Sequence, residues 1–321
     1  MDDFTGRIAV VTGGGTGMGR ELVRQLSKVG CHVATCDVSQ GAMDETRALA
    51  LEEAPEGTRV TTFVADVADE AQMIRFRDAV ANDHQTEHVN LLFNNAGIAG
   101  AGSFVDDDRS AWERTFAIVW GGVYIGCRTF MAMLLAADEG HIVNTSSING
   151  IFASIGPLNP HTAYSAAKFA VRGFSEALIA DLRVHAPHVH VSVVLPGHIG
   201  TSIVINSGVV HGKEPDNLDA RDIEKIRRRF AIAGTPIDEV ADDDIRKGVA
   251  MMGEAFRDVA PLSAASAATI ILDGVRAGEW RILVGEDAKV VDEMVRADPV
   301  HAYDPSFWDA ILAQGHFGGF A

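Results

Sequence analysis

Along residues 7–195, short apolar runs alternate with amphipathic stretches. The runs are rich in Val, Ile and Leu, and they predict buried strands over 7–12, 32–37, 59–64, 89–93, 141–145 and 190–195. The stretches between them carry apolar side chains at helical spacing and predict helices over 20–29, 41–53, 69–82, 109–137 and 162–185. Apolar strands that alternate with helices form parallel sheets covered on both faces. The pattern therefore predicts an α/β fold of the Rossmann type, a doubly wound parallel sheet of about seven strands.

The alternation stops after residue 198 and returns near the C-terminus. Residues 199–256 are polar and charged, and a segment of this length predicts a substrate-binding lid with short helices of its own. A helix over 262–277 and a strand over 281–284 follow. The C-terminal extension, 286–321, predicts a helix and an aromatic tail of Tyr303, Phe307, Trp308, Phe317 and Phe320. Because no repeat or low-complexity linker divides the chain, we expect one domain over 1–321.

The charge balance limits the partners of the protein. Its 27 basic residues are outnumbered by 44 acidic ones, and the net charge of −17 disfavours nucleic acids and anionic membrane surfaces. A basic cluster, Arg227 to Arg229, is a candidate for binding an anionic substrate group, although we favour a solvated helix face. The three cysteines form neither a disulfide framework nor a metal-ligand spacing, and the N-terminus lacks the pattern of a signal peptide. We therefore expect a cytoplasmic protein without a bound metal.

The stretch 116–137 is about as long and as apolar as a membrane span. However, Arg128 lies inside it, and glycines at 121, 122 and 126 lower its hydrophobicity. We therefore expect a helix buried in the core or in a subunit interface, and no membrane partner.

A glycine-rich turn joins the first predicted strand to the first predicted helix. Gly13, Gly17 and Gly19 let the backbone approach a pyrophosphate, and the helix N-terminus offers it unpaired N–H groups. Asp37 ends the second strand, where a dinucleotide fold places an acid on the adenosine ribose. Because no Arg or Lys adjoins Asp37 to hold a 2′-phosphate, the pattern predicts NAD rather than NADP. In the alternative, Asp37 only caps the turn before Gln40.

Polar or turn residues also follow the later strands, namely Asp66, Asn94, Ser147 and Pro196. Parallel sheets bind ligands beyond the carboxyl ends of their strands, so we expect these residues to border one cleft.

Tyr164 and Lys168 lie at i,i+4 spacing in a predicted helix and therefore on one face of it. A neighbouring cation favours the phenolate, so we expect Lys168 to lower the pKa of Tyr164 and make it a usable acid/base. The same spacing occurs by chance in exposed helices, and the pair gains its weight from the motifs around it.

Taken in order, these motifs resemble those of the short-chain dehydrogenase/reductases over roughly residues 1–285. The resemblance implies that Ser147, Tyr164 and Lys168 are catalytic, that Asp66 contacts the adenine, and that Thr201 holds the nicotinamide carboxamide. It implies cofactor contacts for a set of residues in the glycine loop, at the strand ends and on the catalytic helix: Gly13, Gly17, Met18, Gly19, Asp37, Asp66, Val67, Asn94, Ala96, Gly97, Tyr164, Lys168, Pro196, Gly197, Ile199 and Thr201.

The activity implied by this resemblance is that of an NAD-dependent alcohol dehydrogenase or ketoreductase. Loop 148–163 looks longer than in most of the family, and with Ile151, Phe152 and Ile203 it predicts a roomy apolar pocket for a bulky, hydrophobic secondary alcohol or ketone. Two other classes stay open, a non-catalytic NAD-binding scaffold protein and a lyase on the same fold. Pairing of the long helices in relatives implies a homodimer or homotetramer.

One position departs from the family pattern. Val119 stands where relatives carry an asparagine that helps relay protons to the lysine. His161 and His198 are candidate substitutes, although plain loop histidines are the simpler interpretation.

Overall fold

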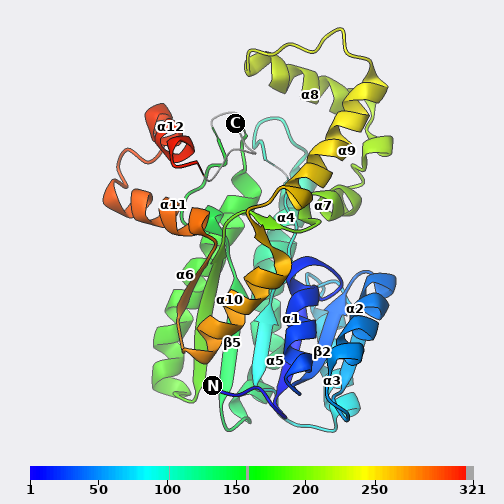
Figure 1. Cartoon of the computed structure of the whole chain (residues 1–321), viewed down its shortest axis with the longest axis vertical. Coiled ribbons are helices and arrows are strands. Elements are labelled where there is room, and N and C mark those ends of the chain that lie inside the picture. The colour runs from blue at the N-terminus through cyan, green and yellow to red at the C-terminus, as the bar shows by residue number, and fades with distance from the viewer. Residues whose placement is uncertain (101, 157–158, 316–321) are drawn as a thin grey trace.

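A computed structural model of the chain describes residues 1–100, 102–156 and 159–315, and its core is a seven-stranded sheet (Figure 1). All pairings in this sheet are parallel, and the strand order is β3-β2-β1-β4-β5-β6-β9. The strands are β1 (Ile8–Thr12), β2 (His32–Asp37), β3 (Val60–Val64), β4 (Leu91–Asn94), β5 (Gly140–Thr145), β6 (Val189–Pro196) and β9 (Arg281–Val284). The predicted fold class is confirmed.

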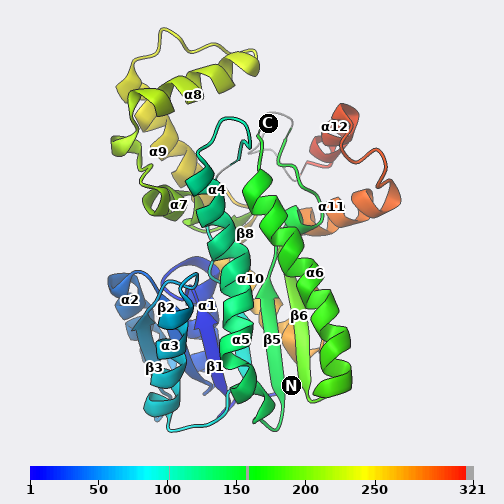
Figure 2. The ribbon, with the colours of Figure 1, turned by 180° about the vertical axis from the view of Figure 1, so that it is seen from behind.

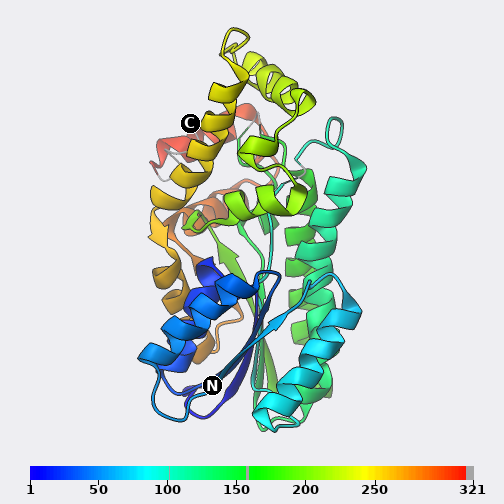
Figure 3. The ribbon, with the colours of Figure 1, turned by 90° about the vertical axis from the view of Figure 1, so that its right-hand side faces the viewer.

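Helices cover both faces of the sheet, as Figures 1 and 2 show from opposite sides and Figure 3 shows edge-on. One face carries α1 (Gly17–Lys28), α2 (Gln40–Glu53) and α10 (Ala264–Arg276), and the other carries α3 (Glu70–His84), α5 (Gly122–Leu135) and α6 (Thr162–His185).

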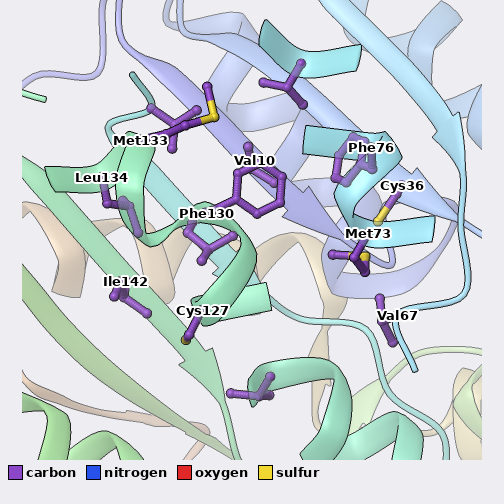
Figure 4. Packing of buried hydrophobic residues seen from close by; sticks show 14 of the residues in the cluster. Val10, Cys36, Val67, Met73, Phe76, Cys127, Phe130, Met133, Leu134 and Ile142 are labelled. Atoms are coloured by element: carbon purple, nitrogen blue, oxygen red, sulfur yellow. The ribbon is translucent and has the colours of Figure 1, made fainter. Parts of the chain in front are cut away.

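Successive residues of a strand point to opposite faces, so one strand serves both layers of the core. Ala9 and Val11 of β1 pack in the layer beneath α1 and α10, whereas Val10 packs in the layer beneath α3 and α5. Figure 4 shows Val10 in that second layer beside Phe76 and Phe130. This two-sided burial explains why the central strand β1 is almost wholly apolar.

The helix predicted over 109–137 forms, with a break that the pattern did not indicate. It consists of α4 (Arg109–Phe116), a π-helical turn (Ala117–Gly121) and α5. By length and composition, the continuous helix Arg109–Leu135 is apolar enough to cross a membrane, but 56% of its most apolar window is buried in the protein. The helix packs against β4, β5 and α3, as expected for a core helix.

Residues 199–263 and 285–315 build the layer above the carboxyl ends of the strands (Figure 3). A short pairing of β7 (Ile199–Gly200) with β8 (Leu262–Ser263) closes the base of this layer. Segment 199–256 has the expected helices, α7 (Ile203–His211), α8 (Ala220–Ile232) and α9 (Asp242–Asp258), and the C-terminal extension forms α11 (Glu286–Ala297) and α12 (Pro305–Ala313).

The basic cluster on α8 is neither an open anion site nor a fully solvated face. Arg227 donates hydrogen bonds to the carbonyls of Ile237 and Val240 and pairs with Asp242, so it holds the turn between α8 and α9. Arg228 forms an ion pair with Asp106 at 2.9 Å. The preference for a solvated face was therefore wrong for Arg227, which is mostly buried.

The aromatic residues of the C-terminal extension pack on the loop that follows β5. The rings of Phe152 and Tyr303 are stacked with centroids 5.2 Å apart, and Phe307 and Trp308 belong to the same cluster. The Tyr303 hydroxyl also accepts a hydrogen bond from the backbone N–H of Ala153 at 3.0 Å. Phe317 and Phe320 of the predicted tail lie outside the described residues.

Candidate active site

The glycine loop between β1 and α1 has backbone geometry that only glycine accommodates readily. Gly13 and Gly17 have φ values of +69° and +55°, in the left-handed region. A Cβ at Gly19 would lie 1.9 Å from the carbonyl oxygen of Gly13, so a side chain there would break the turn. The loop opens into a cleft at the N-terminus of α1, which is the setting that a dinucleotide phosphate requires.

The cleft gathers predicted residues from several strand ends, with further residues that the motifs did not single out. The predicted residues that line it are Gly13, Gly17, Met18, Asp37, Asp66, Val67, Ala96, Gly97 and Thr201. The additional ones include Thr16, Val38, Asn95, Arg114, Ile118, Ile203, Asn206 and Val210.

Asp37 lies at the end of β2 with both carboxylate oxygens engaged. Oδ2 accepts a hydrogen bond from Gly15 N–H at 3.0 Å, and Oδ1 accepts one from Ser39 N–H at 3.1 Å. The carboxylate therefore braces both the glycine loop and the following turn, and it also borders the cleft. Arg20, the nearest cation of the loop, is bound to the Gly15 carbonyl and paired with Glu45.

Just after β3, Asp66 is paired with a residue that no sequence motif singled out. Arg114 of α4 lies 2.6 Å from Asp66 Oδ2, and both side chains line the cleft. Oδ1 of Asp66 accepts a hydrogen bond from Ala68 N–H at 2.9 Å. A ligand group that hydrogen-bonds to Asp66 would therefore share its carboxylate with the guanidinium of Arg114.

The side chains of Asn94 and Asn95 form hydrogen bonds to different parts of the structure. Asn94 is buried in the core, where its side-chain amide donates to Asn144 Oδ1 at 2.9 Å. Asn95 instead stabilises the start of the glycine loop, because its side chain donates to the carbonyl of Thr12 at 3.1 Å. The buried amide of Asn94 is thus retained by its partners in the sheet.

The three predicted catalytic residues come from two elements. Ser147 follows β5, and Tyr164 and Lys168 lie one turn apart on α6. The ammonium nitrogen of Lys168 is 5.4 Å from the centroid of the Tyr164 ring and donates a hydrogen bond to the carbonyl of Thr145 at 2.7 Å. A Cβ at Gly97, on the wall of the cleft, would be 3.8 Å from Lys168 Nζ, so the group adjoins the cleft.

Burial controls the protonation of this pair. It raises the pKa of Tyr164 to about 12, with the Ser147 hydroxyl acting in the opposite direction, and it lowers the pKa of Lys168 to about 7. The expectation that Lys168 lowers the pKa of Tyr164 was therefore wrong for the protein alone. Removal from water disfavours the charged form of each group, and in both cases this is the largest cause of the shift in pKa.

Segment 196–201 begins at the last residue of β6, includes β7 and reaches the cleft at Thr201. Thr201 lines the cleft, and its methyl group would lie 3.1 Å from a Cβ at Gly17. Pro196, Gly197 and Ile199 do not line it. From α7, Asn206 donates to the hydroxyl of Thr16 at 3.1 Å, so α7 contacts the cofactor loop directly.

The structure shows the surroundings of Val119 and of the two histidines that are candidates to replace the missing asparagine. Val119 is 1% exposed within the π-helical turn and packs in the core. The ring of His161 lies 4.7 Å from that of Tyr164, and burial lowers the pKa of His161 to about 4. His198 places Nε2 at 2.7 Å from the carbonyl of Phe256. His161 therefore lies next to the tyrosine.

Comparison with known proteins identifies the family to which the chain belongs. The family model described as short chain dehydrogenase matches residues 7–209. The oxidoreductase named SadH of Mycobacterium tuberculosis is 33% identical over 296 residues, which cover 92% of each chain. Levodione reductase of Leifsonia aquatica is 31% identical over 205 residues, 64% of this chain and 73% of that protein. The chain belongs to the short-chain dehydrogenase/reductase family of oxidoreductases.

Solved structures agree with this assignment. A short-chain dehydrogenase/reductase from Burkholderia phymatum in complex with NAD superposes with a TM-score of 0.75 at 25% identity, covering 95% of this chain and 98% of the other. A metagenomic short-chain oxidoreductase in complex with NADP is 27% identical, with a TM-score of 0.53 over 60% of this chain and 83% of the other. Members with this fold thus bind either nicotinamide dinucleotide.

Proposed function

We propose that the protein is an NAD-dependent dehydrogenase or ketoreductase that acts on a bulky, hydrophobic secondary alcohol or ketone. The observation that carries this proposal is the meeting of Ser147, Tyr164 and Lys168 beside a cleft that has Asp37 on its wall.

The residues present fit a dinucleotide. The left-handed glycines and the close approach of Gly19 to Gly13 form a backbone cradle that side chains would fill. Gly13, Gly17 and Thr16 would hold the phosphates, and Asp37 would receive the adenosine ribose hydroxyls. Asp37 would repel a 2′-phosphate, and this supports NAD over NADP. When bound, NAD supplies a nicotinamide ring that accepts or releases a hydride.

The remaining chemistry is a proton transfer performed by this chain. Tyr164 would take a proton from the substrate hydroxyl during oxidation and return it to the carbonyl oxygen during reduction. Ser147 would donate a hydrogen bond to the same oxygen and stabilise developing charge there. Lys168, held by the Thr145 carbonyl next to Tyr164, would supply positive charge when protonated.

Apolar side chains support the assignment of a hydrophobic substrate. Ile118, Ile203 and Val210 line the cleft. Ile151 and Phe152, which were also expected in the pocket, are instead buried in separate hydrophobic clusters. A named relative, levodione reductase, is by its name a reductase of levodione. We further propose segment 199–256 as a lid, a homodimer or homotetramer, and a cytoplasmic location.

The test follows reduced-nicotinamide absorbance with a panel of bulky secondary alcohols and ketones, with NAD and NADP compared. We expect turnover with NAD, and none in Tyr164→Phe. Tight NAD binding without turnover of any substrate would favour the non-catalytic scaffold, and light scattering would give the oligomeric state.

A further inference from the structure

Asp287 is a buried carboxylate in the first turn of α11, beyond the family motifs. It is 2% exposed. Its Oδ2 accepts a hydrogen bond from the backbone N–H of His198 at 2.6 Å, and its Oδ1 accepts one from Ala288 N–H at 2.9 Å. Burial of a carboxylate is costly unless such donors satisfy it, and the N-terminus of a helix adds favourable partial positive charge. The position therefore holds a hydrogen-bond acceptor aimed at the backbone of segment 196–201.

Gly197 brings that backbone directly against the carboxylate. A Cβ at Gly197 would lie 2.1 Å from both carboxylate oxygens of Asp287, so no side chain fits there without displacing the acid. Gly197 N–H also donates to the carbonyl of Val284 on β9 at 2.9 Å. Together with the contact of His198 to Phe256 of α9, three elements fix this short segment.

The same segment leads to Thr201 on the wall of the cleft. The position of Thr201 matters because the family resemblance implies that it holds the nicotinamide carboxamide. A hydride passes only between closely aligned atoms, and a misplacement of about 1 Å is enough to cost roughly 100-fold in rate.

We propose that Asp287 is a positioning residue for hydride transfer. It fixes segment 196–201 through the N–H of His198 and the backbone of Gly197, and thereby sets the place of the nicotinamide ring. The inference rests on the proposed function, because it requires NAD(H) in the cleft. It gives the C-terminal extension a part in catalysis.

Asp287→Asn tests the contact, because an amide keeps the shape but turns an NH₂ group toward one of the two N–H donors. We expect the Kd for NADH, measured by fluorescence, to rise about tenfold, as for a lost hydrogen bond to a charged group. We expect kcat to fall roughly 10- to 100-fold. The Kd for ADP-ribose, which lacks the nicotinamide, should stay at the wild-type value.

Two further variants separate positioning from stability. Asp292→Asn is the matched control, because Asp292 is a buried carboxylate of the same helix that pairs with Arg281 at 2.8 Å. It should lower Tm and leave the ratio of NADH to ADP-ribose affinity unchanged. Gly197→Ala approaches the same contact from the other side, so it should lose NADH affinity selectively even if Asp287→Asn does not fold.

The outcomes are distinct. Equal weakening of both ligands in Asp287→Asn and Gly197→Ala, or wild-type behaviour in both, would overturn the inference and leave the proposed function standing. Failure of the wild-type protein to bind either ligand would overturn the proposed function and the inference with it.

Discussion

Removal of the charge at Asp37 is expected to shift the cofactor preference from NAD towards NADP. In Asp37→Asn, NAD loses the charged acceptor for its ribose hydroxyls, which is worth about 1 kcal/mol relative to a neutral one. NADP is relieved of repulsion between two charges roughly 4 Å apart, which amounts to about 1 kcal/mol in water and about 4 kcal/mol at an effective dielectric constant near 20. Because Asp37 is half-buried, we take about 2 kcal/mol.

The two effects together amount to about 3 kcal/mol, or roughly a 150-fold change in the ratio of kcat/KM for NAD to kcat/KM for NADP. The assay measures both constants with the same alcohol by absorbance of the reduced cofactor. A ratio within about threefold of wild type would refute the assignment of Asp37 to the ribose, since that is under 1 kcal/mol.

A control is needed because Asp37 also braces Gly15 and Ser39. Asp69 caps α3 by accepting a hydrogen bond from Gln72 N–H at 3.0 Å, and it does not line the cleft. Asp69→Asn should therefore lower stability without a change in cofactor ratio.

Four other outcomes are expected. Tyr164→Phe should bind NADH normally and lose about 10²- to 10⁴-fold in turnover, whereas retained turnover would contradict its role as acid/base. Since burial raises the pKa of Tyr164, alcohol oxidation should accelerate up to about tenfold per pH unit above neutrality while ketone reduction does not, and a flat oxidation profile would exclude this order of events. Burial lowers the pKa of His84 to about 4 and of His141 to about 3, so the folded state is favoured while both side chains are neutral. This contribution to stability is complete above the unfolded pKa of about 6.5 and is lost as the pH falls below it. At pH 5 the loss amounts to about 2 kcal/mol per histidine. Urea unfolding at pH 7.5 and pH 5 measures this, and a pH dependence unchanged in His141→Gln would disprove it. Val119→Asn should cost about 1–3 kcal/mol in stability and leave turnover unaltered, because the residue is buried in the core, and faster turnover would instead reveal a missing relay.

The sheet and helix α6 were predictable because their causes are local. The central strands β1 and β4 are buried on both faces and are therefore mostly apolar, and the bounds of α6, Thr162–His185, coincide with the predicted helix. The π-helical turn within 109–137 leaves no comparable mark, because its residues are as apolar as those on either side of it.

The contacts that complete the site join residues far apart in the chain. The pairs Asp66–Arg114 and Thr16–Asn206 form only once the sheet has brought separate segments together. The same holds for Asp287 and the backbone of His198. The pKa of Tyr164 was predicted with the wrong sign because helical spacing reports that a cation is near and says nothing of how much water is excluded.

The exclusion of water around Tyr164 favours one form of the catalytic pair. Within the described part of the site, the contacts of the phenol are the hydroxyl of Ser147, the ring of His161 and the side chain of Lys168. His161 is neutral at pH 7 because burial lowers its pKa to about 4, and Lys168, with a pKa of about 7, carries only part of a charge. The chain alone therefore keeps Tyr164 protonated, which is the form that donates to a ketone. Loss of that proton in the proposed oxidation requires positive charge beyond what these side chains hold, so we expect oxidation to depend on positive charge brought by what occupies the cleft.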